Sequence, residues 1–230
     1  MKIKKGFILG AGIMGTGIAH LMAQKGVEAI LVDINEEILK SSISNIEKIL
    51  NRRVERGKMT ADEVKELVGR ITTTTDMKAA AEADFIIEAV VEDVGLKQKL
   101  FAQLEEVAKP DAVLATNTTA CSISEIASAL KDPSRLVGMH FFNPAVVMRL
   151  VEIMPGLATD PKIVETTREF AEFLGKEPVV TDKEGIAGVA SRVLAALLNE
   201  AVWVLEEGIC SAADIDKAMQ MGSNHPMGPL

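Results

Sequence analysis

Apolar residues follow two alternating patterns along the chain. Short runs rich in apolar and β-branched residues predict strands at residues 3–9, 28–33, 71–74, 84–90 and 112–116. Stretches in which apolar residues recur every three or four positions predict helices at residues 12–25, 36–50, 60–69, 96–108 and 122–130. Strands that alternate with helices in this way build a parallel sheet, because parallel neighbours need a long crossover connection.

The pattern becomes purely helical toward the end of the chain. Before that point, strands are predicted at residues 135–142, 149–154 and 177–182, and a helix at residues 161–174. The last two segments, residues 189–207 and 212–221, are both helical in pattern. We therefore expect a doubly wound, Rossmann-type α/β domain with a helical excursion over residues 1–185. Part of an all-α domain should follow over residues 186–230.

Composition narrows the possible partners and surroundings. The 230 residues carry 33 acidic and 25 basic side chains, a net charge of −8, so nucleic acid is not an expected partner. No uncharged apolar stretch reaches the about 18 residues that cross a membrane, so we expect no membrane span. Cys121 and Cys210 lie far apart without metal-ligand spacing. We expect no disulfide scaffold, no metal site and a cytoplasmic location.

A glycine pattern follows the first predicted strand and opens the first helix. Gly10, Gly12 and Gly15 form G-x-G-x-x-G, with Ile13 and Met14 in the last two x positions. The first glycine allows a tight turn, the second lets the backbone approach a pyrophosphate, and the third lets helix and strand pack closely. Backbone N–H groups at the helix start would face the phosphates. The pattern predicts a dinucleotide site.

Asp33 ends the second predicted strand, 18 residues after Gly15. A carboxylate at this place accepts hydrogen bonds from the adenosine ribose and repels a 2′-phosphate, so the expected cofactor is NAD, not NADP. The alternative is a plain glycine-rich turn in which Asp33 only caps the following helix.

Of the three histidines, His140 is the candidate for chemistry. It ends a predicted strand at the carboxyl edge of the sheet, where ligands bind in open α/β sheets. Glu152 lies 12 residues later on the next strand, and antiparallel pairing of the two strands would bring the side chains together. Imidazole beside carboxylate makes a general base suited to neutral pH. The alternative is a structural histidine and a surface glutamate.

Several segments together resemble the L-3-hydroxyacyl-CoA dehydrogenase family, which includes bacterial 3-hydroxybutyryl-CoA dehydrogenases. They are GAGIMGTGIA, DFIIEAVVED, ATNTT, GMHFFNP and RLVEI, together with Asp33. The resemblance covers the whole chain. It implies an NAD-binding Rossmann domain, a helical C-terminal domain that forms a homodimer, and an acyl-CoA substrate of fatty-acid metabolism.

The resemblance also implies roles for individual residues. His140 would be the catalytic base and Glu152 its partner. Thr119 stands where the family usually has a serine that contacts the substrate hydroxyl, and Arg56 lies on the helical excursion that helps hold coenzyme A. Cofactor contacts are implied for Ala89, Glu92, Lys97, Asn117 and Asn143. Without the resemblance, Glu92 is a helix-start acid, Lys97 a solvated lysine and Arg56 part of a solvated basic face.

Two departures from the family pattern stand in the last part of the chain. Ser191 replaces a usual asparagine on the substrate side, with one hydroxyl in place of an amide. The sequence ends at Leu230, where the family continues into further helices, so the homodimer stays open as an expectation. The function implied by the resemblance is NAD-dependent oxidation of a short-chain (S)-3-hydroxyacyl-CoA to the 3-ketoacyl-CoA, or the reverse reduction, and two alternatives stay open. One is another β-hydroxyacid dehydrogenase, and the other is a non-catalytic NAD-binding protein, crystallin-like or redox-sensing.

Overall fold

The computed structural model describes residues 3–230, which fall into two compact units that divide after Gly185. In the first unit the described residues form one eight-stranded sheet in the order β3-β2-β1-β4-β5-β6-β7-β8. The strands are β1 (Lys5–Leu9), β2 (Glu28–Val32), β3 (Ile71–Thr74), β4 (Phe85–Glu88), β5 (Val113–Thr116), β6 (Leu136–Phe141), β7 (Leu150–Pro155) and β8 (Glu177–Val180). The predicted doubly wound α/β fold is confirmed.

All neighbouring strands are parallel except β6 and β7, which are antiparallel. The carboxyl ends of β1, β2, β4, β5 and β6 therefore meet at one edge of the sheet. The turns that follow these strands carry most of the residues singled out from the sequence. The order reverses between β1 and β4, which is the kind of switch point where open α/β sheets bind ligands.

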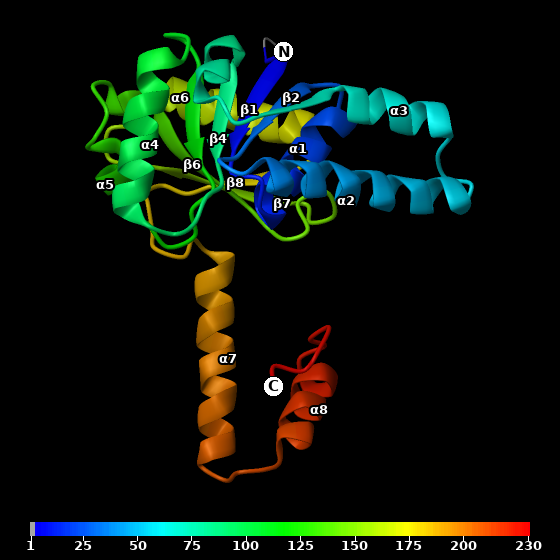
Figure 1. The fold of residues 1–230 in the computed structure, drawn as a ribbon. Helices are drawn as coiled ribbons and strands as arrows, with labels where there is room; N and C mark the ends of the chain where they lie inside the picture. The colour runs from blue at the N-terminus through cyan, green and yellow to red at the C-terminus, as the bar shows by residue number, and fades with distance from the viewer. Residues whose placement is uncertain (1–2) are drawn as a thin grey trace. The chain divides into compact units, whose positions relative to one another are not determined.

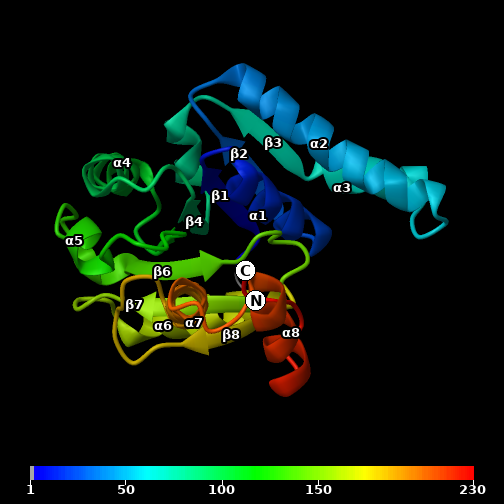
Figure 2. The same cartoon turned by 90° about the horizontal axis from the view of Figure 1, so that it is seen from below.

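Helices cover both faces of this sheet (Figures 1 and 2). One face packs on α1 (Ile13–Gln24), α2 (Glu36–Glu55), α3 (Ala61–Gly69) and α6 (Pro161–Phe173). The other face packs on α4 (Val94–Val107), α5 (Ile123–Ala127) and a short 3₁₀ helix, η1 (Met77–Glu82), and a second 3₁₀ helix, η2 (Pro133–Arg135), contacts α5. Because both faces are covered, the central strands are buried along their length, as parallel sheets require.

Helices α2 and α3 pack against each other and extend away from the sheet, so the predicted helical excursion is present (Figure 1). Asn35 caps α2 by accepting a hydrogen bond from the backbone of Glu37 at 2.8 Å. Thr60 and Glu63 form a reciprocal capping box at the start of α3. Side-chain caps at both helix starts fix the excursion locally.

Strand β6 lets α5 approach closely because it carries a glycine at the contact. A Cβ atom at Gly138 would lie 2.6 Å from Cδ1 of Ile123 and 3.1 Å from the carbonyl oxygen of Met154. Gly138 and His140 share one face of the strand, since alternate residues point the same way. The turn from β5 into α5 is thereby held over that face.

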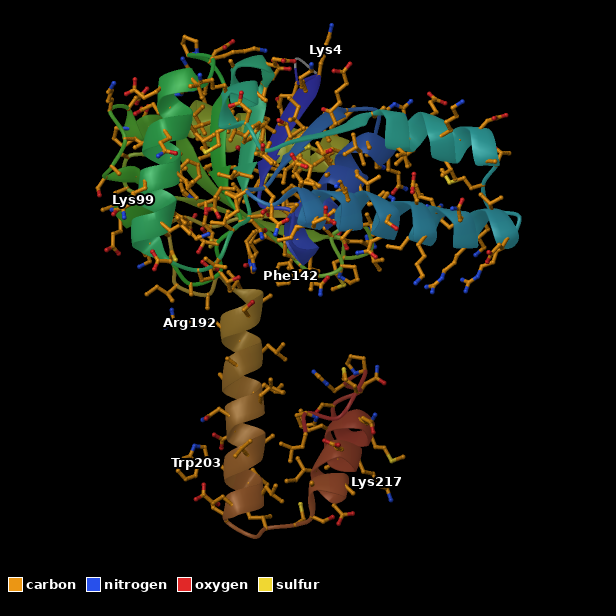
Figure 3. All side chains as sticks on the ribbon, in the orientation of Figure 1. Lys4, Lys99, Phe142, Arg192, Trp203 and Lys217 are labelled. Carbon is orange, nitrogen blue, oxygen red and sulfur yellow. The ribbon has the colours of Figure 1, made fainter. Side chains whose placement is uncertain are left out.

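The second unit contains α7 (Ala190–Glu206) and α8 (Ala212–Gly222), which pack against each other. Trp203 is half exposed and projects from α7 on the side away from α8 (Figure 3). Among residues 3–230, no helix has the length and apolar character needed to span a membrane.

Candidate active site

The first glycine turn can be built only with glycine at two positions. Gly10 has a φ of +101°, and a Cβ atom there would lie 2.6 Å from the carbonyl oxygen of Ala89. A Cβ atom at Gly15 would overlap the carbonyl oxygen of Gly10. The glycine turn thus packs closely between the end of β4 and the start of α1. The first residues of α1 stay accessible from outside.

The amino terminus of α1 fits a diphosphate group. Apart from its own chain neighbours, nothing lies within 4 Å of the place where a Cβ of Gly12 would stand, and Gly12 and Ile13 are exposed. Within residues 3–230 no side chain caps α1, and its first turn contains no acidic residue. The free N–H groups and the helix dipole therefore favour an anion here.

Asp33 braces the glycine turn from the end of β2. Its carboxylate accepts hydrogen bonds from the backbone N–H of Ala11 at 2.8 Å and of Asn35 at 3.2 Å. The alternative in which Asp33 caps α2 is wrong, because Asn35 is the cap. A carboxylate has about four acceptor positions, so Asp33, which is half buried, keeps acceptor capacity for ribose hydroxyls.

His140 and Glu152 face each other across the antiparallel pair β6–β7. They are directly opposed in the strand register, and Nδ1 of His140 lies 3.2 Å from Oε2 of Glu152. The two residues are 5% and 1% exposed, so the alternative of a surface glutamate is wrong. A carboxylate only accepts hydrogen bonds, so Nδ1 of the neutral ring carries the proton and Nε2 is the acceptor.

Thr119 contacts the other ring nitrogen. Its Oγ1 lies 3.0 Å from Nε2 of His140, at the position where a reacting hydroxyl would exchange a proton with the ring. The ring of Phe142 is tilted against the imidazole with centroids 4.6 Å apart, which limits the space around it. Thr119, His140 and Glu152 therefore form one continuous polar row.

The structure places Lys97 deep inside the first unit. Its side chain is 1% exposed, and Nζ lies 2.6 Å from Oε1 of Glu88 and 3.7 Å from Oε2 of Glu92. The alternative of a solvated lysine is therefore wrong. Glu92 is 41% exposed, and its carboxylate accepts hydrogen bonds from Thr118 and Thr119, each at 2.6 Å. Glu88 is a buried carboxylate that the sequence analysis did not single out.

Asn117 and Asn143 have different surroundings. Oδ1 of Asn117 accepts the backbone N–H of Phe141 at 2.8 Å, which ties the end of β5 to β6. Asn143 is exposed on the loop between β6 and β7. Lys176, which the sequence gave no reason to select, holds this loop by donating to the carbonyl oxygens of Ala145 at 2.5 Å and Met148 at 2.7 Å. Burial lowers the pKa of Lys176, and Lys25 acts in the same direction.

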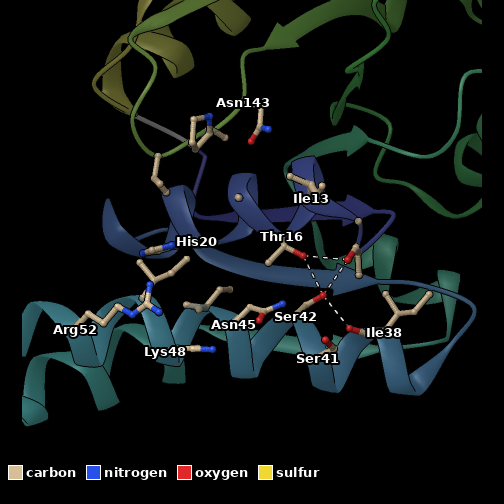
Figure 4. Close-up of a pocket in the computed structure, with 18 of the residues that line it drawn as sticks. Ile13, Thr16, His20, Ile38, Ser41, Ser42, Asn45, Lys48, Arg52 and Asn143 are labelled. Carbon is tan, nitrogen blue, oxygen red and sulfur yellow. Dashed lines mark hydrogen bonds between the residues drawn. The ribbon is translucent and has the colours of Figure 1, made fainter.

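A cavity of about 780 Å³ opens beside the glycine turn (Figure 4). Gly12 and Ile13 of the turn, Asn143 of the β6–β7 loop, and one side of α2 line it. The α2 side chains include Ser41, Asn45, Lys48 and Arg52. Arg56 is the C-cap of α2 and lies outside this lining. The cavity thus joins the open start of α1 to two cationic side chains, Lys48 and Arg52, and to the acidic Glu37.

Ser42 and Thr16 connect this cavity wall to the turn. Oγ of Ser42 donates to the carbonyl oxygen of Ala11 at 2.9 Å, and Thr16 contacts both at 3.0 Å (Figure 4). His20 on α1 is 4% exposed, and burial, with Arg53 acting in the same direction, lowers its pKa to about 4. His20 is therefore a neutral, packed histidine.

Ser191 lies in the first turn of α7, in the second unit, and is half buried. Its role, like that of Arg56, stays a prediction.

Comparison with known proteins shows the family of the chain. Residues 6–185 match the family model of the 3-hydroxyacyl-CoA dehydrogenase NAD-binding domain, and residues 189–230 match the model of the C-terminal domain. A probable 3-hydroxybutyryl-CoA dehydrogenase of Bacillus subtilis is 40% identical over 100% of this chain and 80% of its own length. The 3-hydroxybutyryl-CoA dehydrogenase of Bradyrhizobium diazoefficiens is 39% identical over 99% of this chain and 78% of its own length.

Solved structures give the same result. The crystal structure of an (S)-3-hydroxybutyryl-CoA dehydrogenase from Ralstonia eutropha matches with a TM-score of 0.96 and 34% identity, over 100% of this chain and 81% of that one. A likeness of this extent covers both units and the residues around His140. The chain therefore belongs to the 3-hydroxyacyl-CoA dehydrogenase family, and its first unit is the NAD-binding domain of that family.

Proposed function

We propose that this chain catalyses the NAD-dependent oxidation of a short-chain (S)-3-hydroxyacyl-CoA, such as 3-hydroxybutyryl-CoA, to the 3-ketoacyl-CoA, or the reverse reduction. The observation that carries the proposal is the row Thr119–His140–Glu152, with contacts of 3.0 and 3.2 Å. This row lies at the same edge of the sheet as the glycine turn. A base and a dinucleotide site at one edge are what alcohol oxidation requires.

The protein supplies the acid–base part of the reaction. Nε2 of His140 takes the proton of the substrate hydroxyl during oxidation and returns it during reduction. Glu152 holds the ring in the required tautomer and stabilises the imidazolium by its charge. Thr119 positions the hydroxyl at Nε2. NAD supplies the hydride acceptor when it is bound.

The cofactor and substrate sites are supported by different groups. The open start of α1 supports the diphosphate, and Asp33 supports the ribose and the preference for NAD over NADP. Lys48 and Arg52 in the cavity supply charges that suit the phosphates of coenzyme A. The half-exposed Cys121 and Cys210 form no disulfide, which supports a reducing compartment such as the cytoplasm.

The test is the formation of NADH from NAD and a series of 3-hydroxyacyl-CoA substrates of increasing chain length, followed at 340 nm. We expect turnover with the (S) enantiomer, fastest with short chains, and far less with NADP. Tight NADH binding without turnover of any acyl-CoA would overturn the proposal and support a non-catalytic NAD-binding protein. Turnover of simple β-hydroxyacids but not of their thioesters would support another β-hydroxyacid dehydrogenase.

A further inference from the structure

Glu92 lies beside the proposed reaction centre, and its carboxylate is occupied by donors of the chain itself. Oε1 accepts the backbone N–H of Thr119 at 2.6 Å, and Oε2 accepts the hydroxyl of Thr118 at 2.6 Å. The thiol of Cys121 donates to Oε2 at 3.2 Å, and burial raises the pKa of this thiol, which keeps it protonated. One carboxylate therefore gathers three donors from the turn between β5 and α5.

We propose that Glu92 is a positioning residue that acts through Thr119 on His140, by fixing the β5–α5 turn so that the Thr119 hydroxyl meets Nε2. The proposal rests on the proposed function for its kinetic consequences. It differs from the role implied by the family resemblance, in which Glu92 contacts the cofactor. The backbone N–H of Thr119 is bound to Glu92, and the hydroxyl of the same residue contacts the His140 ring. The hydroxyl therefore has little freedom to move.

Lys97 keeps this carboxylate charged and in place. Its ammonium group lies between the buried Glu88 and Glu92, 2.6 and 3.7 Å from their nearest oxygens. Glu88 also accepts from Thr116 Oγ1 and from the backbone N–H of Val90, each at 2.7 Å. The row Glu88–Lys97–Glu92 thus connects the ends of β4 and β5 to α4, next to the turn between β5 and α5.

The protonation state of Glu92 agrees with this role. Burial alone would raise the pKa of its carboxyl group, but the hydrogen bonds from Thr118, Thr119 and Cys121, with the charge of Lys97, outweigh burial and lower the pKa. The ionised form accepts best from Thr118 and Thr119, because both of its oxygens are acceptors and neither carries a proton. A neutral glutamine would have to turn an NH₂ group toward one of these donors.

A double-mutant cycle separates positioning from direct cofactor contact. Glu92→Gln is made in the wild type and in Thr119→Val, which lacks the hydroxyl. We expect Glu92→Gln to lower kcat about tenfold in the wild type, with NADH affinity nearly unchanged, and to change kcat less than about twofold in Thr119→Val. Equal effects on kcat in both backgrounds, or weakened NADH binding in both, would overturn the proposal.

The chain offers a matched control on the same helix. Glu105 of α4 also holds a turn by accepting two backbone N–H groups, those of Lys131 and Asp132, each at 2.8 Å. Glu105→Gln should leave kcat unchanged, so a loss of rate in this variant would assign the effect of Glu92→Gln to general loosening of the unit.

A second measurement does not depend on turnover. The ¹⁵N NMR signal of His140 Nε2 reports its hydrogen bond to Thr119. We expect this signal to shift in Glu92→Gln and not in Glu105→Gln, and an unchanged signal in Glu92→Gln would overturn the positioning role. If the wild type oxidises no 3-hydroxyacyl-CoA, the proposed function fails, and this signal still decides whether Glu92 positions Thr119.

Discussion

Nδ1 of His140 lies 3.2 Å from Oε2 of Glu152 across directly opposed positions of the antiparallel strands β6 and β7. The pair is nearly inaccessible to solvent, so the orientation of the ring is set by two strands and not by mobile loops. In such surroundings the electrostatic effect of the carboxylate on the ring is stronger than in water. Three other sites allow equally direct tests.

Replacement of His140 by glutamine removes the base and keeps a polar side chain of similar size. We expect turnover of 3-hydroxybutyryl-CoA to fall by about 10²-fold or more, since general acid–base catalysis contributes about 10²–10⁴-fold. NADH affinity should change little, because His140 does not belong to the glycine turn. Stopped-flow rates and NADH titration measure the two effects, and parallel loss of both would assign His140 a structural role.

Removal of the Asp33 carboxylate should change cofactor choice. Asp33→Ala is expected to raise the Kd for NADH about tenfold and to reduce the difference between the Kd values for NADH and NADPH. Asp33→Asn keeps an acceptor for the N–H of Ala11 and removes the charge, so it isolates the repulsion of a 2′-phosphate. If neither variant alters the ratio of the two dissociation constants, the ribose is recognised by another residue.

Lys97→Met should destabilise the first unit strongly. The variant leaves the Glu88 carboxylate buried without its cation, a change that typically costs about 3–5 kcal/mol. The double variant Glu88→Gln with Lys97→Met should recover part of the loss, because no unpaired charge remains. Urea unfolding gives both values. The exposed Lys65 provides a control, since Lys65→Met should change the free energy of unfolding by less than about 0.5 kcal/mol.

His20 should make the protein less stable in mild acid. Its pKa falls from 6.5 in the unfolded chain to about 4 in the fold, so between these values the unfolded chain binds the extra proton. Stability from this group is complete above about pH 6.5 and is lost as the pH falls toward 4, by about 2 kcal/mol at pH 5. Urea unfolding measures the free energy of unfolding at pH 7 and at pH 5, and the difference between the two values should be smaller in His20→Gln than in the wild type. An identical difference would contradict this assignment.

The hydrophobic pattern was enough to predict the layered architecture, because each buried strand and each amphipathic helix leaves its own period in the sequence. Element ends were predicted less well. Helix α2 continues to Glu55, beyond the predicted end at Leu50, because Val54 extends its apolar face and no helix breaker occurs before Gly57. Helix α5 ends at Ala127, three residues short of the predicted end. The 3₁₀ helix η1 was not predicted, since its alanine-rich segment lacks a clear period.

The residues of the candidate site that belong to local motifs could be predicted from the sequence. Those whose surroundings depend on burial in the folded chain could not. The glycine pattern, Asp33 and the His140–Glu152 spacing are local features of the sequence. The burial of Lys97 depends on the packing of α4 against β4, which no local pattern records. One signal was available: Glu88 interrupts an apolar strand, and a buried carboxylate needs a charged or hydrogen-bonding partner. The hydrogen bonds from Lys176 to the β6–β7 loop have no comparable signal in the sequence.

Gly138 stands two residues before His140 on the same face of β6, directly under α5. A single methyl group added there would press against the end of the Ile123 side chain and against the carbonyl oxygen of Met154, so that side chain or the neighbouring strand would have to shift. We therefore expect bulk at this position, which touches neither group, to change the distance between the Thr119 hydroxyl and the His140 ring. A series of side chains of increasing volume at residue 138 would then adjust the reaction rate while every reacting group stays chemically unchanged.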